Sequence, residues 1–136
     1  MSALVELCCV DPARVAIIWP RVAQWINHAM ARGGMGRFAD VEADVLGANA
    51  KLWLATEQGA VLAAAVTKVT AGDGKRVCTI VACAGHGWPR FGALLTKLET
   101  HAWAQGCGEM EICGRPGWLR RLKDYRLVKA VIRKSL

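Results

Sequence analysis

The sequence contains no long apolar run. Hydrophobic residues make up 54% of its 136 residues, yet no segment reaches the roughly 18 consecutive apolar residues of a membrane-spanning helix. Residues 1–6 also lack the basic start and apolar core of a signal peptide. The length suits one domain spanning residues 1–136. We therefore expect a cytoplasmic protein that does not enter a membrane.

The cysteines lack the spacing of a zinc knuckle. No CxxC pair occurs among the six: Cys8, Cys9, Cys78, Cys83, Cys107 and Cys113. Cys83 and His86 form an isolated CxxH, which is too little for a metal site. In a chain without an export signal we expect reduced thiols in mostly buried positions, and no bound metal.

The positive charge is unevenly distributed. The net charge is +7 and the pI is about 9.4. Basic residues concentrate in the last part of the chain: Arg115, Arg120, Arg121, Lys123, Arg126, Lys129, Arg133 and Lys134. A phosphate-bearing partner such as a nucleotide cofactor or a nucleic acid would suit this charge. Because the sequence has no aromatic signature of an RNA-binding strand, we expect a solvated basic face and keep nucleic-acid binding as the weakest alternative.

The first part of the sequence, before residue 51, predicts a strand followed by two helices. Residues 4–10 form a short apolar run, and Asp11-Pro12 are a good N-cap and first helical residue. Apolar residues then recur at spacings of three and four up to Ala29, and Pro20 predicts a kink or a break near Trp19. Asp40 is expected to cap a second, short helix.

In residues 51–84 the sequence pattern changes from that of helices to that of β-strands. Three β-compatible segments, 51–56, 60–69 and 76–84, are separated by turn sequences at Gln58-Gly59 and at 71–74. We predict an antiparallel meander.

The second half alternates helices and strands. A helix is predicted for 89–105, with Phe91, Leu94, Leu95, Leu98, Ala102 and Trp103 on one face. Next come a strand at 109–114, a short helix at 116–124 and a last strand at 127–136. The crossover from 76–84 to 109–114 implies parallel pairing, so the sheet is mixed. The expected fold class is α/β (α+β), with about six strands in a central sheet flanked by about four helices.

This order of elements resembles the GNAT fold of N-acetyltransferases. The likeness is closest in residues 76–127. The segment Gly114-Arg115-Pro116-Gly117-Trp118 is similar to one found in phage-associated GNAT-like proteins, which would place the protein in the host cytoplasm.

The resemblance implies acyl transfer from acetyl-CoA to an amine. The pantetheine arm would lie between two splayed strands, 76–84 and 109–114, against the backbone of Val81, Ala82 and Cys83. The pyrophosphate would lie at the start of the next helix, near these residues: Gly85, Gly87, Arg90 and Gly92. The sequence departs from the family's phosphate motif at His86, Pro89 and Phe91. Proline offers no N–H and phenylalanine obstructs a close approach, so an altered phosphate site is expected.

The tyrosine that donates a proton in the family has no counterpart at the matching position of this sequence. Leu122 takes the position of the usual tyrosine and Arg115 that of the usual asparagine, whereas Tyr125 lies three residues later. Three residues are about three-quarters of a helical turn, so Tyr125 need not face a cofactor.

Two functional hypotheses remain. One is an acyl-CoA-dependent N-acyltransferase in which His86 or Glu111 is the base and Tyr125 or a water is the acid. The other, which we prefer slightly, is a non-catalytic module of phage or prophage type that binds a protein partner or a second copy. Six tryptophans support a role in binding, although Trp25, Trp53 and Trp103 are expected in the core.

Overall fold

A computed structural model describes residues 5–33, 36–85, 88–114 and 116–136. Its elements follow in this order: β1 (Val5–Cys9), η1 (Pro12–Arg14), α1 (Val15–Gly33), α2 (Phe38–Leu46), β2 (Lys51–Glu57), β3 (Ala60–Gly72), β4 (Lys75–Gly85), α3 (Trp88–Ala104), β5 (Glu109–Ile112) and η2 (Pro116–Arg120). The two η elements are short 3₁₀ helices.

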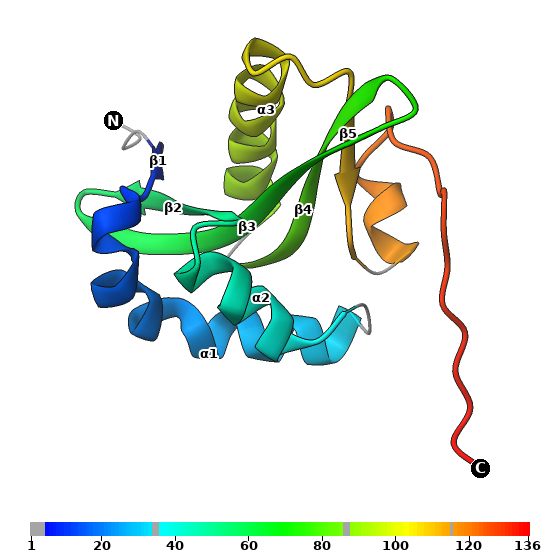
Figure 1. The fold of residues 1–136 in the computed structure, drawn as a ribbon, viewed down its shortest axis with the longest axis horizontal. Helices are drawn as coiled ribbons and strands as arrows, with labels where there is room; N and C mark the ends of the chain where they lie inside the picture. The colour runs from blue at the N-terminus through cyan, green and yellow to red at the C-terminus, as the bar shows by residue number, and fades with distance from the viewer. Residues whose placement is uncertain (1–4, 34–35, 86–87, 115) are drawn as a thin grey trace.

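The strands form one mixed sheet in the order β1-β2-β3-β4-β5. The first four pair antiparallel, and β5 pairs parallel with β4 after the crossover through α3. Helices α1 and α2 cover one face of the sheet and α3 covers the other (Figure 1). The expected α+β class with a mixed sheet is confirmed, with five strands across the described residues.

The start of the helical region is as predicted, and the helix does not break at its internal proline. The carboxylate of Asp11 accepts a hydrogen bond from the Ala13 N–H at 2.9 Å, with Pro12 as the next residue. Helix α1 then continues through Pro20, so of the two predicted alternatives, a kink or a break near Trp19, the break does not occur. Proline removes one backbone hydrogen bond, and the buried stripe that includes Trp19 and Val22 outweighs that loss.

The cap of α2 also differs from the prediction. The N-cap is Arg37, which makes no side-chain capping bond, and Asp40 lies inside the first turn. There the carboxylate interacts favourably with the positive end of the helix dipole.

Both predicted hairpin turns are present. Gln58 and Gly59 have φ of 51° and 82°, and Asp73 and Gly74 have φ of 50° and 78°. Two consecutive positive φ angles are typical of the turn whose twist matches antiparallel strands, and glycine adopts them without strain. These turns join β2 to β3 and β3 to β4.

The two faces of the sheet bury different cores. Under α1 and α2 lies one continuous cluster that includes Ile26, Val45 and Val66. Under α3 lie three smaller clusters, one of them formed by Trp53, Ile80 and the α3 leucines. Core positions were wrongly predicted for two tryptophans: Trp103 is 75% exposed and Trp25 is 36% exposed.

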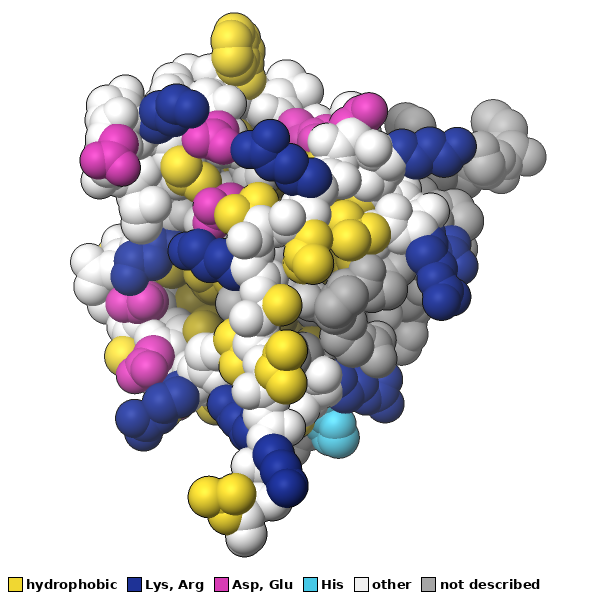
Figure 2. Space-filling model, turned by 90° about the vertical axis from the view of Figure 1, so that its right-hand side faces the viewer, with side chains coloured by type: hydrophobic (Ala, Val, Ile, Leu, Met, Phe, Trp, Pro, Cys, Tyr) yellow, Lys and Arg dark blue, Asp and Glu magenta, His cyan; other side chains and the backbone are white. Residues whose placement is uncertain are grey.

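The chain after η2 forms no strand, so the prediction of a last strand at 127–136 is wrong. This segment runs extended along the β5 side of the molecule and away from it (Figure 1). An apolar alternation produces a strand when a neighbouring strand supplies hydrogen bonds, and the segment has none within the described residues. Figure 2 shows hydrophobic side chains beside Lys and Arg on the surface of this side. None of the described helices has the length and apolar character to cross a membrane.

Candidate functional site

Strands β4 and β5 pair at one end and part at the other. Their register joins Val77 to Glu109 and ends with Ile80 opposite Ile112. One further backbone bond runs from the Cys113 N–H to the Ile80 carbonyl, at 2.9 Å. Strand β4 continues to Gly85, and no described residue pairs with 81–85 on that side. The two parallel strands therefore form a wedge that opens after Ile80.

A β-bulge lies at the point where the wedge opens. In the pairing of β3 with β4, Thr67 lies opposite Ile80 and Val66 opposite Ala82, which leaves Val81 as an extra residue. A bulge bends its strand and increases the local twist, and this one lies where the pairing of β4 with β5 ends.

The bulge also changes which side chains face α3. Ile80 packs under α3, whereas both Val81 and Ala82 pack into the core of α1 and α2. Cys83 then returns to the α3 face. An undisturbed strand would alternate throughout, so the bulge explains the two successive residues on one face.

Cys83 presents its backbone to the open side. The Ile80 carbonyl faces β5, because it accepts the bond from Cys113. Residues on one face of a strand direct their N–H and C=O groups to the same neighbour. Because Cys83 lies on the same face as Ile80, its N–H and C=O are directed into the wedge, where an extended ligand could bond to them.

The thiols at the wedge are neutral at ordinary pH. Burial, and then the nearby Cys113, raise the pKa of Cys83 to about 12. Burial and the charge of Glu111 raise the pKa of Cys113, and Lys129 partly offsets this rise. The thiols are therefore poor nucleophiles and act as apolar walls.

Helix α3 begins at the open end of the wedge. The start of a helix directs N–H groups and partial positive charge towards an anion, although Pro89 supplies no N–H here. Gly92 is half-buried in the first turns. The predicted residues His86 and Gly87 lie outside the described residues, and the structure describes the backbone of Arg90 but not its side chain.

Gly85 has a structural reason to be glycine. A Cβ at this position would clash with the Ala63 Cβ and would lie 2.9 Å from the Leu62 carbonyl oxygen. The end of β4 therefore packs closely on β3, and this contact accounts for the glycine without a phosphate.

Glu111 lies on the face of β5 opposite α3. Its neighbours Met110 and Ile112 pack under α3, so its carboxylate alternates to the side of α1 and α2. There it accepts a hydrogen bond from the Thr79 hydroxyl at 3.4 Å. Glu111 is half-buried. It lies two residues before Cys113, which makes the last backbone hydrogen bond between β5 and β4.

Tyr125 lies on the other face. Its hydroxyl donates a 2.7 Å hydrogen bond to the carboxylate of Glu99 in α3, and its side chain packs against the core cluster that contains Leu122. Burial, and then the bond to Glu99, raise its pKa well above the usual value. The sheet separates Tyr125 from Glu111, so the structure does not bring these two candidates together.

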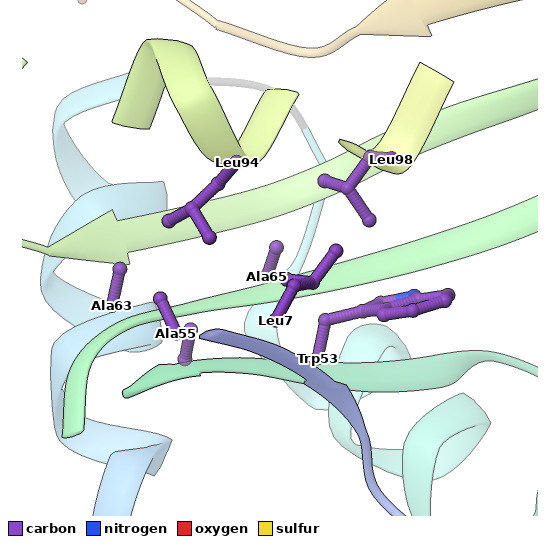
Figure 3. Close-up of a pocket in the computed structure, with 8 residues that line it drawn as sticks. Leu7, Trp53, Ala55, Ala63, Ala65, Leu94 and Leu98 are labelled. Atoms are coloured by element: carbon purple, nitrogen blue, oxygen red, sulfur yellow. The ribbon is translucent and has the colours of Figure 1, made fainter. Parts of the chain in front are cut away.

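A small cavity lies elsewhere on the α3 face. It has a volume of about 10 Å³, and its lining is apolar: Leu7, Trp53, Ala55, Ala63, Ala64, Ala65, Leu94 and Leu98. Figure 3 shows Leu94 and Leu98 directed from α3 towards the alanines of β2 and β3. This is space for about one water molecule, with no polar group to hold it. The cavity is a packing gap next to small alanine side chains, and it is too small for a ligand.

Two residues at the wedge were missed by the sequence argument. Cys113 makes the last backbone bond between the strands, and Thr79 holds Glu111. Their positions follow from the β4–β5 register, and no local motif indicates them. Across the described residues, no group of three or more His, Cys, Asp or Glu side chains is arranged to hold a metal ion.

Several solved structures that are similar to this chain are acetyltransferases. Over 97% of this chain and all of the other, the fold matches a ribosomal-protein-alanine N-acetyltransferase from Brucella melitensis with a TM-score of 0.66 and 15% identity. A GNAT family acetyltransferase from Staphylococcus aureus matches over 99% of this chain and all of its own, with a TM-score of 0.64 and 10% identity.

The chain has the GNAT fold. A predicted acetyltransferase from Clostridium acetobutylicum, solved with acetyl-CoA, shares this fold over 97% of this chain and 96% of its own, with a TM-score of 0.64 and 10% identity. No protein-family model and no curated protein matches the sequence. Within the GNAT fold, the wedge lies between the two strands that the sequence resemblance indicated.

Proposed function

We propose that the chain binds acyl-CoA in the wedge between β4 and β5. The observation that carries the proposal is the parting of these strands after Ile80, which leaves the backbone of Cys83 directed to the open side. The GNAT fold of a protein solved with acetyl-CoA supports it.

The residues present fit such a ligand. The N–H and C=O of Cys83 suit the amides of a pantetheine arm, and the neutral thiols of Cys83 and Cys113 provide an apolar wall. The start of α3 and the net positive charge suit the phosphates. Pro89 removes one donor, so the phosphate contacts contribute less than in a helix that begins with free N–H groups.

We further propose that the chain is a binding or assembly module that transfers acyl groups slowly or not at all. Its single tyrosine donates to Glu99 and is separated from Glu111 by the sheet. A proton donor for a leaving thiolate must lie within hydrogen-bond reach, and Tyr125 is engaged elsewhere. The similarity of residues 114–118 to phage-associated GNAT-like proteins supports a role of this kind in a phage or prophage.

A second candidate function is an amine N-acyltransferase. The position of Glu111 favours it, because the carboxylate faces the side of α1 and α2 close to the opening of the wedge. Bound acyl-CoA would supply the activated acyl group. Glu111, or His86, would accept a proton from the attacking amine, and a water would protonate the leaving thiolate.

Binding and turnover distinguish the two candidates. Acetyl-CoA at 100 times its Kd adds about 2.7 kcal/mol, which raises the Tm by several degrees. Cys83→Pro removes the N–H that faces the wedge and should abolish the shift, whereas the matched variant Cys83→Ala should retain it. Equal binding by both variants would disprove the wedge proposal.

Turnover is followed as thiol released from acetyl-CoA with a panel of primary amines. We expect no release above the rate without protein. The alternative outcome is that the wild-type chain releases thiol and that Glu111→Gln lowers this rate about a hundredfold or more. That result would establish an acyltransferase with Glu111 as the base.

A further inference from the structure

Residues 116–136, here called the basic region, carry almost all of the protein's net charge. They contain seven basic side chains and one acidic side chain, Asp124, so they contribute +6 of the net charge of +7. Residues 1–115 are nearly balanced, with eleven basic and ten acidic side chains. The positive charge is therefore concentrated on the β5 side of the molecule, where Figure 2 shows Lys and Arg side chains at the surface.

The basic side chains of this region face solvent. All seven are exposed: Arg120, Arg121, Lys123, Arg126, Lys129, Arg133 and Lys134. The last four of them make no ion pair with any residue that the structure describes. Like charges at this density repel one another until counter-ions or a partner neutralise them. The region therefore offers positive charge that an anionic partner would neutralise.

The basic region has an anchored half and an extended half. Leu122 is buried under α3 and the hydroxyl of Tyr125 is bonded to Glu99, so residues 118–125 are held on the domain. Residues 126–136 form an extended arm, and no backbone hydrogen bond joins this arm to the rest of the described chain (Figure 1). The arm spans about 26 Å between residues 126 and 134 when fully extended. Basic arms on folded domains commonly hold nucleic acids.

We propose that the basic region binds the phosphate backbone of a nucleic-acid double helix without reading its sequence. A double helix carries one negative charge per about 1.7 Å of its axis, so an arm of this length meets several phosphates. Each Lys or Arg that neutralises a phosphate releases a condensed counter-ion, and this release drives the binding. The proposal is independent of acyl-CoA in the wedge, because it uses different residues.

A double helix suits the basic region better than a single strand. Proteins that hold single strands stack the bases on exposed aromatic side chains. The aromatic residues of the basic region, Trp118 and Tyr125, instead pack against the core cluster under α3. The sequence argument gave nucleic-acid binding little weight because an RNA-binding aromatic signature is missing, but contacts to phosphates need no such signature.

The conformation of the arm disfavours an anionic membrane as the partner. Basic segments that lie on a membrane form an amphipathic helix whose apolar face enters the lipid. Residues 126–136 form no helix, and in an extended chain Val131 lies on the same side as Lys129 and Arg133. The arm therefore does not separate its apolar and basic side chains, and it suits a phosphate backbone better than a bilayer surface.

The first test measures binding of the full chain to a short, fluorescein-labelled DNA duplex by fluorescence anisotropy. The affinity should fall about a thousandfold between about 50 and 200 mM salt, as expected for about six phosphate contacts. A duplex of unrelated sequence should bind equally well, and a single strand of the same length should bind more weakly. A parallel titration with an RNA duplex shows which double helix the region prefers.

Neutralising the arm should remove a defined share of this salt dependence. The triple variant Lys129→Gln, Arg133→Gln and Lys134→Gln loses three phosphate contacts. We expect the slope of log affinity against log salt to become shallower by about three. Lys129→Arg with Lys134→Arg keeps the charge and should bind like the wild-type chain.

A matched control removes the same charge from another part of the surface. It carries Arg14→Gln, Arg21→Gln and Arg32→Gln, at exposed positions of η1 and α1. Its salt slope should equal that of the wild-type chain, and circular dichroism checks that each variant is folded. Both triple variants should keep the rise in Tm with acetyl-CoA, which separates this site from the wedge.

Five results would overturn the proposal. The first three are no binding of either duplex at about 50 mM salt, a salt slope that the arm variant leaves unchanged, and tighter binding of the single strand than of the duplex. The fourth is sedimentation of the chain with vesicles of phosphatidylserine and phosphatidylcholine without binding to a duplex, which would assign the region to a membrane. The fifth is loss of the acetyl-CoA shift in the arm variant, which would assign these residues to the phosphates of that ligand.

Discussion

The two faces of the sheet are stabilised in different ways. Under α1 and α2, a single apolar cluster crosses β2, β3 and β4, with Ile26 fully buried. Under α3, three smaller clusters are interrupted by polar groups, among them Tyr125 bonded to Glu99 and a buried, unpartnered nitrogen of His101. The face of α1 and α2 therefore carries most of the stability, and the α3 face carries the groups that respond to pH.

The largest expected loss of stability comes from a substitution in the apolar core under α1 and α2. Ile26→Ala should cost about 4 kcal/mol, because its enclosed site leaves a cavity that cannot collapse. Leu94→Ala on the α3 face should cost about 2 kcal/mol, since Leu94 already borders a small cavity. Urea unfolding measures both, and a larger loss for Leu94→Ala would reverse the comparison.

The next effect concerns the contact of β3 with β4 at the open end of the wedge. Gly85→Ala should cost about 1–3 kcal/mol, because the new methyl group meets the Ala63 Cβ and the Leu62 carbonyl. Gly72→Ala is the matched control, since nothing lies within 4 Å of a Cβ there and its cost should be small. If the two variants unfold at the same temperature, the close contact does not matter.

The third effect tests the polar side of the comparison. The pKa of Tyr125 is raised, so its contribution to stability is complete below pH 10 and is lost as the pH rises further. Tyr125→Phe should cost about 1 kcal/mol at pH 7 and should reduce the loss of stability above pH 10. Because the chain has one tyrosine, its ultraviolet absorbance reports this titration directly. Titration near pH 10 would contradict the buried bond to Glu99.

The smallest effect is expected at the ion pair between Lys68 and Asp44, 3.1 Å apart on the α1 and α2 side. Both side chains are about one-third exposed, so solvent screens the attraction. Lys68→Ala should cost no more than about 0.5 kcal/mol, measured by urea unfolding at low salt. A loss above 1 kcal/mol would show that this face also depends on polar contacts.

Local patterns predicted several elements correctly. Asp11-Pro12, Gln58-Gly59 and Asp73-Gly74 act through their own backbone geometry, so they indicate a helix start and two hairpins without knowledge of distant residues. The parallel pairing of β4 with β5 followed from a strand, a helix and a strand in succession.

Other features depend on neighbours that a local pattern cannot specify. Trp103 directly follows the buried Ala102 on α3, and at about 100° per residue its side chain is turned away from the stripe of Leu94, Leu98 and Ala102, so it remains exposed. The segment 127–136 alternates as a strand does, and it lacks an adjacent strand. The bulge at Val81 has no sequence signal, because it reflects the mismatch between β3 and β4.

The amino-acid sequence alone was sufficient for the two hairpin turns and for the order of elements up to residue 120, because these follow from interactions between residues close together in the chain. The region of the wedge was indicated by the resemblance to the GNAT fold. The placement of Glu111 and Tyr125 on opposite faces required the tertiary structure. A side chain's face depends on strand register, on bulges and on the helix that packs above it, and these are contacts between distant parts of the chain.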